Sequence, residues 1–363
     1  MSQSKSDRQF DVIVVGAGNA ALAAAVAARE AGAGRVVVLE KASEEHRGGN
    51  TRFSGGLLRF AYDSAEQVLE VAPEAKDLEG FLDGIDPYPA SAFRSDLRRM
   101  TEGRTDADLS EVLIGKSYET VRWMAGLGIA MEPAVSLGGI VVDGKIKWPK
   151  GAVIRAVHEG VGLSETWFRI AQEKGVEIRY GHAARSLLQD DSGRVCGVQV
   201  ASDVGIVELS ARSVVLGAGG FEANAAWRGQ YLGAPWDHAK VRGTRHNQGD
   251  GLRMALEAGA LPIGQWTGCH ATPIDAAAAD YGVLKMTDRT NRLSYPFGVM
   301  INRESGAFGP EPKAVGHYGF GGSCGFADPE RGVSGAYVMN RQSNHLQGDP
   351  RARRLVDALY GCL

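Results

Sequence analysis

The pattern of apolar and polar residues near the start of the chain predicts a strand, a helix and a second strand. Residues 11–15 (DVIVV) form a short β-branched run that is typical of a buried parallel strand. An alanine-rich stretch then continues to about Gly32 and has the composition of a helix. Residues 36–39 (VVVL) are again β-branched and predict the second strand. The order strand–helix–strand is the βαβ unit of a parallel α/β sheet.

The turn between the first strand and the helix carries the sequence G-x-G-x-x-A. Gly16 allows a tight turn, Gly18 lets the backbone approach a diphosphate, and Ala21 keeps the helix close to the strand. The N-terminus of the helix offers N–H groups and its dipole to phosphate oxygens. Glu40 ends the second strand, where an acid accepts hydrogen bonds from a ribose diol. These features predict a dinucleotide site; a glycine-rich turn in another kind of α/β unit is the alternative.

Further along, the pattern changes from helical to alternating. Residues 77–82 and 109–124 show helical periodicity, and their sequence indicates no chemical role. A helix over 164–174 and a strand over 176–180 are followed by a β-hairpin, with strands at 182–188 and 195–200 and a D-D-S-G turn. The remaining expected elements are an extension of that small sheet at 207–209, a buried strand at 213–216 and a helix at 252–257.

Three further segments have the composition of a ligand-binding backbone. The loop of residues 47–56 (RGGNTRFSGG) is dense in glycine and suits a large flat ligand, although a solvent loop has a similar composition. The strand at 213–216 opens into Gly217-Ala218-Gly219-Gly220, where a backbone can meet a cofactor. Asp250 precedes a helix, so it is either a ligand contact or simply the helix N-cap. His182 is expected to be an ordinary surface or turn histidine.

Composition and charge narrow the class of protein. The chain has 363 residues, enough for two or three domains, and 44 % of them are hydrophobic. The net charge is −3 without a long basic run, which argues against nucleic acid as a partner. Four widely spaced cysteines predict free thiols, with neither disulfides nor a metal site. The polar N-terminus lacks the apolar core of a signal peptide, and glycines interrupt the apolar stretch 12–28, so we expect a cytoplasmic protein without a membrane span.

Residues 264–275 (GQWTGCHATPID) are rich in polar functional groups and have no amphipathic period. His270 and Thr272 supply hydrogen-bond donors that a carboxylate substrate requires at fixed positions. A structural role for His270 is the alternative. These two residues are the candidate catalytic positions.

The residues of the first 56 positions resemble the FAD-binding domain of the fumarate reductase and succinate dehydrogenase flavoprotein superfamily. The segments VVGAGNAALAAAVAAREAG, VLEK and RGGNTRFSGG carry this likeness, which is strongest toward tricarballylate dehydrogenase-like proteins. Some relatives bind FAD covalently through a histidine in the glycine-rich loop. None lies between Gly48 and Gly56, so non-covalent FAD is expected. The cofactor-binding residues that the resemblance implies are Gly16, Gly18, Ala21, Glu40, Lys41, Gly49, Asn50, Thr51, Ser54, Gly55, Gly56, Ala183, Gly217, Gly219 and Asp250.

The resemblance continues through His270, which in the superfamily corresponds to a histidine that holds a substrate carboxylate, and through residues 293–303. It ends at about Gly309. The expected remainder of the capping domain is missing, including its proton-transferring arginine and the last segment that closes over the flavin. The expected domains are therefore an FAD-binding domain at 1–262 and a truncated α+β capping region at 263–312.

The remaining tail, residues 313–363, resembles the C-terminal end of serine β-lactamase-like esterases. His317-Tyr318-Gly319 would correspond to the K-T-G-type motif, and strands at 322–327 and 335–339 and a helix at 351–359 are expected. Hydrolysis in that family needs S-x-x-K. The chain has this spacing only at Ser2 and Lys5, in a polar terminus, so a complete hydrolase is not expected.

Taken together, the sequence predicts an α/β protein with a Rossmann-type FAD-binding domain, a small β-hairpin sheet, a truncated cap and an unrelated tail. The function that the resemblance implies is an FAD-dependent oxidoreductase acting on a small polycarboxylate such as tricarballylate or a succinate- or fumarate-like acid. Electrons would pass to an unidentified carrier. A flavin-binding remnant with little turnover is the alternative, and a serine hydrolase is the second alternative.

Overall fold

The computed structural model describes residues 9–134, 140–142, 145–148, 151, 153–234, 236–272, 274, 277–285, 315–318, 324–337 and 350–362. Its contacts divide the chain into two compact units. The first comprises Met1–Cys269 and Ala279–Thr287, and the second comprises His270–Ala278 and Asp288–Leu363. Residues 293–303, which carry part of the resemblance described above, lie outside the described residues.

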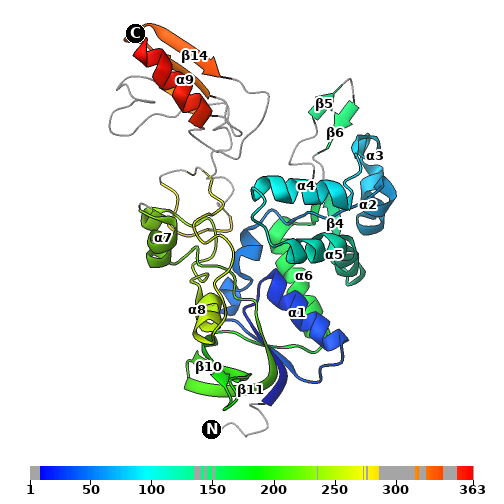
Figure 1. Ribbon diagram of the computed structural model, residues 1–363. Helices are drawn as coiled ribbons and strands as arrows, with labels where there is room; N and C mark the ends of the chain where they lie inside the picture. The colour runs from blue at the N-terminus through cyan, green and yellow to red at the C-terminus, as the bar shows by residue number, and fades with distance from the viewer. Residues whose placement is uncertain are drawn as a thin grey trace. The chain divides into compact units, whose positions relative to one another are not determined.

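A six-stranded sheet with the order β8-β2-β1-β11-β10-β9 forms the centre of the first unit (Figure 1). Strands β8, β2, β1 and β11 are parallel, and β10 and β9 add an antiparallel edge. The strands are β1 (Gln9–Val15), β2 (Val36–Leu39), β8 (Glu177–Arg179), β9 (Ala183–Gln189), β10 (Val195–Ser202) and β11 (Gly205–Leu216).

Strand β11 is twelve residues long and joins the two parts of this sheet. Its first half pairs with β10 from Gly205 to Ser210, and its second half pairs with β1 from Ser210 to Leu216. The sequence pattern predicted two separate pieces, at 207–209 and 213–216. The polar residues Ser210 and Arg212 interrupted the apolar pattern, but they continue one strand with their side chains exposed.

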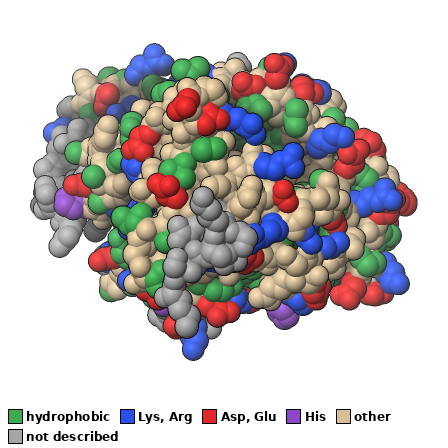
Figure 2. Space-filling model, turned by 90° about the horizontal axis from the view of Figure 1, so that it is seen from below, with side chains coloured by type: hydrophobic (Ala, Val, Ile, Leu, Met, Phe, Trp, Pro, Cys, Tyr) green, Lys and Arg blue, Asp and Glu red, His purple; other side chains and the backbone are tan. Residues whose placement is uncertain are grey.

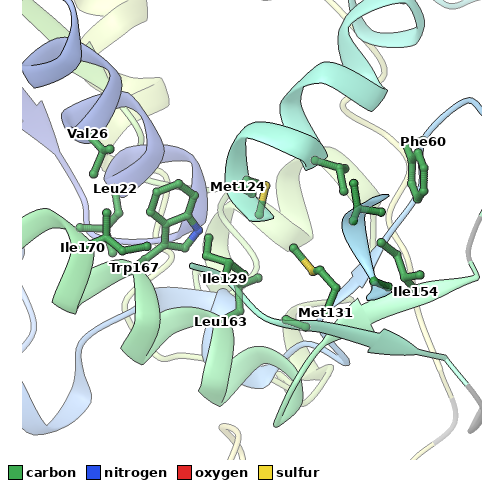
Figure 3. Packing of buried hydrophobic residues seen from close by; sticks show 14 of the residues in the cluster. Leu22, Val26, Phe60, Met124, Ile129, Met131, Ile154, Leu163, Trp167 and Ile170 are labelled. Atoms are coloured by element: carbon green, nitrogen blue, oxygen red, sulfur yellow. The ribbon is translucent and has the colours of Figure 1, made fainter. Parts of the chain in front are cut away.

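Each face of the parallel strands packs against a different set of side chains because successive residues of a strand point to opposite faces. On one face, Val14 and Val38 join a large cluster with Leu22 and Val26 of α1 (Asn19–Glu30) and Trp167 of α6 (Glu159–Glu173). Figure 3 shows Trp167 and Ile170 of α6 beside Leu22 and Val26 of α1.

On the other face, Ile13, Val15 and Leu39 form a smaller cluster with Val198 and Val200 of the antiparallel edge. Met254 of α8 (Asp250–Glu257), which is fully buried, belongs to the same cluster. The sheet is therefore covered on both sides, as its uninterrupted β-branched strands require.

A mainly helical region follows β2 in the sequence. It contains a three-stranded sheet in the order β3-β7-β4 and a two-stranded hairpin, β5-β6. Its strands are β3 (Leu57–Leu58), β4 (Met131–Pro133), β5 (Ile140–Val142), β6 (Lys145–Lys147) and β7 (Ile154–Ala156). Its α-helices are α2 (Ala65–Val71), α3 (Phe81–Gly84), α4 (Ala90–Met100) and α5 (Ala107–Gly126), and the 3₁₀ helices here and in the preceding loop are η2 (Glu44–His46), η3 (Gly49–Phe53) and η4 (Pro73–Asp77).

Between β11 and α8 lie α7 (Ala225–Leu232) and the 3₁₀ helix η6 (Trp236–His238). Arg228 on α7 is only 8 % exposed and holds this segment together. Its guanidinium donates hydrogen bonds to the backbone carbonyls of Glu222, Trp236, Asp237 and Ala239, at distances of 2.5–3.0 Å. The chain then continues directly into residues 241–247.

The described part of the second unit is a three-stranded antiparallel sheet with one helix. The strands β12 (Val315–Tyr318), β13 (Cys324–Asp328) and β14 (Val333–Tyr337) pair in this order, and α9 (Pro350–Gly361) covers them. Cys324 and Phe326 pack against Ala352 and Val356. Asp328 accepts hydrogen bonds from the backbone of the following turn and from the Tyr360 hydroxyl.

The predicted α/β class with a Rossmann-type unit and a small hairpin sheet is confirmed. Within the described residues, no helix is both long enough and apolar enough to cross a membrane. On the face shown in Figure 2, acidic and basic side chains are interspersed.

Replacement of Arg228 by methionine is expected to destabilise the first unit by about 3 kcal/mol or more, because several buried carbonyls lose their donor at once. Chemical unfolding followed by circular dichroism measures this loss. Arg169→Met is the control, since Arg169 forms only an exposed ion pair with Glu173 and should contribute about 0.5 kcal/mol or less. Equal stabilities of the two variants would contradict the structural role of Arg228.

Candidate cofactor site

Three parallel strands end at the same edge of the sheet and bring three glycine-containing or polar turns together. Strand β1 ends at Val15 before Gly16, β2 ends at Leu39 before Glu40, and β11 ends at Leu216 before Gly217. Backbone bonds join the turns directly: Gly16 N donates to Leu39 O at 2.8 Å, and Gly217 N donates to Val15 O at 2.9 Å. Ligands of open α/β sheets bind outside such carboxyl ends.

A cavity of about 420 Å³ lies at this edge. The strand ends, the start of α1, the 49–51 segment and the stretch before α8 all contribute to its wall. Its lining residues are Val15, Gly16, Ala17, Gly18, Asn19, Ala20, Leu39, Glu40, Lys41, Ala42, His46, Gly49, Asn50, Thr51, His182, Ala184, Leu216, Gly217, Ala218, Gly219, Thr244, His246, Asn247 and Asp250.

The floor of the cavity depends on a close approach between two glycines. Gly16 has a φ of +97°, and a Cβ placed there would lie 2.6 Å from Gly217 O. A Cβ on Gly217 would lie 2.7 Å from the Cβ of Ala21. Ala21 therefore does not line the cavity but packs beneath it, where a larger side chain would push the turn after β11 away from α1.

The N-terminus of α1 faces this cavity with Gly18 at its N-cap. Gly18 makes no side-chain capping bond, and the first turn of α1 contains no acidic residue. A Cβ on Gly18 would meet only Thr51 Oγ1, at 3.4 Å, and Gly48 O, at 3.9 Å. The Asn19 N–H bonds to Thr51 Oγ1, and the helix end as a whole is electropositive, which favours an anionic group such as a diphosphate.

Glu40 is a buried acid, with 6 % of its surface exposed. Burial raises the pKa of its carboxyl group, and hydrogen bonds from the backbone of Ala42, Ala17 and Lys41 oppose this shift. The bond from Ala42 N to Oε1 is 2.8 Å long. The backbone thus holds the carboxylate in place in the wall of the cavity, where it can accept hydrogen bonds from hydroxyl groups.

Lys41 and Asp250 form an ion pair with Nζ and Oδ2 2.5 Å apart, and both line the cavity. Asp250 is the first residue of α8, and its carboxylate accepts a hydrogen bond from Lys41. The N-cap position of α8 is taken by Gly249, so the simple capping role considered for Asp250 does not apply.

Three histidines also line the cavity, and sequence reasoning did not select them. Desolvation lowers the pKa of His246, and the positive charges of Lys41 and Arg245 act in the same direction. Nδ1 of His182 lies 2.7 Å from the carbonyl of Tyr180. A carbonyl only accepts, so Nδ1 carries the proton and Nε2 of the neutral ring is an acceptor. His182 was expected to be an ordinary turn residue, but it contributes to the wall together with His46.

The first half of the 47–56 loop is anchored at two points. Arg47 donates to Glu165 on α6 at 2.6 Å and to the Tyr180 hydroxyl at 3.1 Å. Asn50 Oδ1 accepts the backbone N–H of Thr244 at 2.9 Å, which joins the loop to the segment after η6. Gly49, Asn50 and Thr51 line the cavity as a result.

Four residues that the resemblance implied as cofactor contacts lie elsewhere in the first unit. Ser54, Gly55 and Gly56 are not among the lining residues, and Gly56 packs against the backbone of Glu159. Ala184 lines the cavity in place of Ala183. Together with Ala21, these positions stay predictions. The other implied residues are Gly16, Gly18, Glu40, Lys41, Gly49, Asn50, Thr51, Gly217, Gly219 and Asp250, and they all lie in the cavity wall.

His270 and Thr272 are not among the cavity residues and belong to the second unit. His270 is exposed and Thr272 is half-buried. Their assignment as catalytic residues stays a prediction.

The arrangement defines a class of protein. A Rossmann-type unit with an open helix N-terminus for a diphosphate and a buried acid at the end of the second strand for a ribose diol fits a dinucleotide. The family comparison agrees: a family model described as an FAD binding domain matches residues 11–272, most of the chain. The chain belongs to this FAD-binding-domain family, and FAD is its cofactor.

Curated reductases and solved structures are similar to parts of the chain. It is 27 % identical over 263 residues to a probable fumarate reductase of Shewanella frigidimarina, covering 72 % of this chain and 41 % of that protein. It is 28 % identical over 271 residues to a vinyl phenol reductase of Lactiplantibacillus plantarum, covering 73 % and 48 %. The open conformation of a flavocytochrome c3 fumarate reductase matches with a TM-score of 0.56 and 26 % identity, over 70 % of this chain and 41 % of that one.

The chain spans less than half the length of these proteins. A second family model, described as β-lactamase, matches residues 274–360 and so follows directly on the first match. The resemblance to the fumarate reductase and succinate dehydrogenase flavoproteins is confirmed. The domain boundaries at 262 and 312 stay predictions.

Gly16 and Gly18 are expected to respond differently to alanine. Gly16→Ala should lower the free energy of unfolding by roughly 2–4 kcal/mol, because the residue has a positive φ and its Cβ would overlap a backbone oxygen. Gly18→Ala should leave the apoprotein almost as stable as wild type, since there is space for the methyl group, but FAD affinity should fall. Thermal unfolding and FAD titration of both apoproteins separate the two effects. FAD affinity equal to wild type in Gly18→Ala would contradict the proposed path of the diphosphate.

Glu40→Gln is expected to stabilise the apoprotein while weakening FAD binding. The folded-state pKa of Glu40 is raised above its ordinary value of 4.5, so its stabilising contribution is present below that pH and is lost as the pH rises through the folded-state pKa. Glutamine has no charge to bury, and its oxygen can still accept from Ala42 N. The gain over wild type should therefore grow with pH, whereas FAD affinity should fall about tenfold or more, since the amide has one acceptor atom fewer. Urea unfolding between pH 4 and 8 (roughly the range of carboxylate and histidine titration) and FAD titration test both parts; a gain that shrinks with rising pH would contradict them.

Proposed function

We propose that this chain is an FAD-dependent oxidoreductase that transfers hydride between the flavin and a small polycarboxylate such as succinate, fumarate or tricarballylate. The single observation that supports this most strongly is the cavity at the ends of β1, β2 and β11, within a chain that matches the FAD-binding-domain family from residue 11 to 272. The similar proteins include a probable fumarate reductase and a vinyl phenol reductase.

The residues of the cavity divide into three proposed roles. The open end of α1 and the backbone at Gly18 bind the diphosphate, and Glu40 binds the adenosine ribose. The 49–51 segment and the turn at Gly217 and Gly219 hold the remainder of the cofactor. FAD, when bound, supplies the hydride-transfer chemistry. No histidine lies between Gly48 and Gly56, which supports non-covalent binding.

On the substrate side, we propose that His270 and Thr272 bind a substrate carboxylate by hydrogen bonds. The exposed imidazole of His270 is a donor in its neutral and its charged form, and the hydroxyl of Thr272 adds a second donor. Electrons would leave through an unidentified carrier.

The test has two steps on the full chain. Acid precipitation of the purified protein should leave the flavin in the supernatant. Succinate, tricarballylate and succinamide are then added anaerobically, and flavin absorbance is followed. The two acids should bleach the flavin, whereas succinamide has the same carbon skeleton as succinate without carboxylates and should not.

His270→Ala should slow the bleaching by on the order of a hundredfold, because a misplaced substrate loses its reactive geometry. His238→Ala is the matched control, since His238 is also highly exposed and lies outside the cavity. A flavin that stays oxidised with every acid would instead favour a flavin-binding protein without turnover. Flavin in the acid pellet would show a covalent link.

A further inference from the structure

Asn19 occupies an unfavourable position for its residue type. It is the first residue of α1, directly after the N-cap Gly18, and among the described residues its side chain bonds only to Trp167. Asparagine lowers helix stability relative to alanine unless it caps the helix. The asparagine thus lowers the local helix propensity without a local benefit, in a helix in which seven of the other eleven residues are alanine.

The side chain of Asn19 bonds instead to a residue 148 positions away. Trp167 Nε1 on α6 donates a hydrogen bond to Asn19 Oδ1 at 2.6 Å. Trp167 is fully buried between α1 and α6, where it packs against Trp123 with ring centroids 5.6 Å apart and beside Leu22 and Val26 (Figure 3). Its position is therefore fixed by the core.

This bond determines which way the amide of Asn19 points. An indole N–H is only a donor, so the oxygen of Asn19 must face Trp167 and the NH₂ group must form the other end. Among the described residues, none accepts a hydrogen bond from Nδ2 of Asn19. Asn19 is half-buried and lines the cavity.

The backbone of Asn19 is already engaged. Its backbone N–H donates to Thr51 Oγ1 at 2.8 Å. At this position of the helix end, a donor for a ligand therefore has to come from the Asn19 side chain. The adjacent residue Gly18 is the one whose backbone the diphosphate is expected to approach. A neutral amide with two hydrogens suits a phosphate oxygen, and a hydrogen bond to a charged group is stronger than one between neutral groups.

We propose that Asn19 binds the diphosphate of FAD through its Nδ2 group and that Trp167 is the positioning residue that aligns it. Asn19 contacts the cofactor, whereas Trp167 acts through Asn19. The inference rests on the proposed placement of the diphosphate. The test of this inference measures FAD affinity, so its result does not depend on whether the chain oxidises or reduces a substrate.

Two substitutions test the role of Asn19, by titrating FAD into deflavinated full-length protein and following thermal unfolding of the same samples. Asn19→Ala removes the donor without adding charge and should weaken FAD binding about tenfold to a hundredfold. Asn19→Asp keeps the acceptor for Trp167 and adds a negative charge at a helix N-terminus, which stabilises the helix. Its apoprotein should unfold no more easily than wild type, yet FAD should bind more weakly still. The added charge also repels the diphosphate without any direct contact, so Asn19→Ala is the deciding variant: a purely structural role would leave its FAD affinity unchanged.

A double-mutant cycle tests Trp167. Trp167→Phe removes the Nε1 donor and should weaken FAD binding about tenfold in the wild-type background, but have no further effect on affinity in Asn19→Ala. Trp123→Phe is the matched control. Trp123 Nε1 donates to Glu30 Oε2 at the far end of α1, at 2.8 Å, so its loss should leave FAD affinity unchanged.

Wild-type FAD affinity in Asn19→Ala would overturn the proposal, and so would an equal effect of Trp167→Phe in both backgrounds. If Trp167→Phe does not fold, Asn19→Ala, measured in affinity and in unfolding temperature, still decides the role of Asn19.

Discussion

The contact between Gly16 and Gly217 is the constraint on which the rest of the cofactor site depends. These turns end two neighbouring parallel strands, and the backbone of one lies where a side chain of the other would be. Because they touch, the N-terminus of α1 is brought over the end of β11, and both become walls of one cavity. Ala21 completes this arrangement from below, since its methyl group already fills the space beside Gly217. Three small residues thus fix the position of a helix end relative to a sheet.

Several polar residues of the site occupy positions that are unfavourable for their ionisation or for local helix stability. Burial raises the pKa of Glu40, and burial and nearby cations lower the pKa of His246. Groups with shifted pKa values of this kind are typical of functional sites. Asn19 is a further example, because asparagine has a lower helix propensity than the alanines of the same helix.

The sequence was sufficient to predict the βαβ unit, the hairpin β9-β10 and most of the cavity residues that follow strand ends. These features are local: β-branched runs, a glycine turn and an acid at a fixed spacing. It did not predict β3, β7 and β4, which have two or three residues each and exist only through pairings such as Leu57 with Arg155. The histidines of the cavity were also missed, because an isolated histidine has no periodic or spacing signal. His46 and His246 meet only because separate segments converge on one sheet edge.

The length and position of β11 have a consequence for how the protein folds. The two central strands of the six-stranded sheet, β1 and β11, are neighbours in space but are separated by almost two hundred residues in the chain. Contacts of such high sequence separation are slow to form because a long loop must be closed first. During synthesis, β1, α1 and β2 leave the ribosome early, while the strand between β1 and the hairpin is still missing. The residues of the cavity wall extend as far as Asp250, so the wall is complete only after every strand of the main sheet has been synthesised.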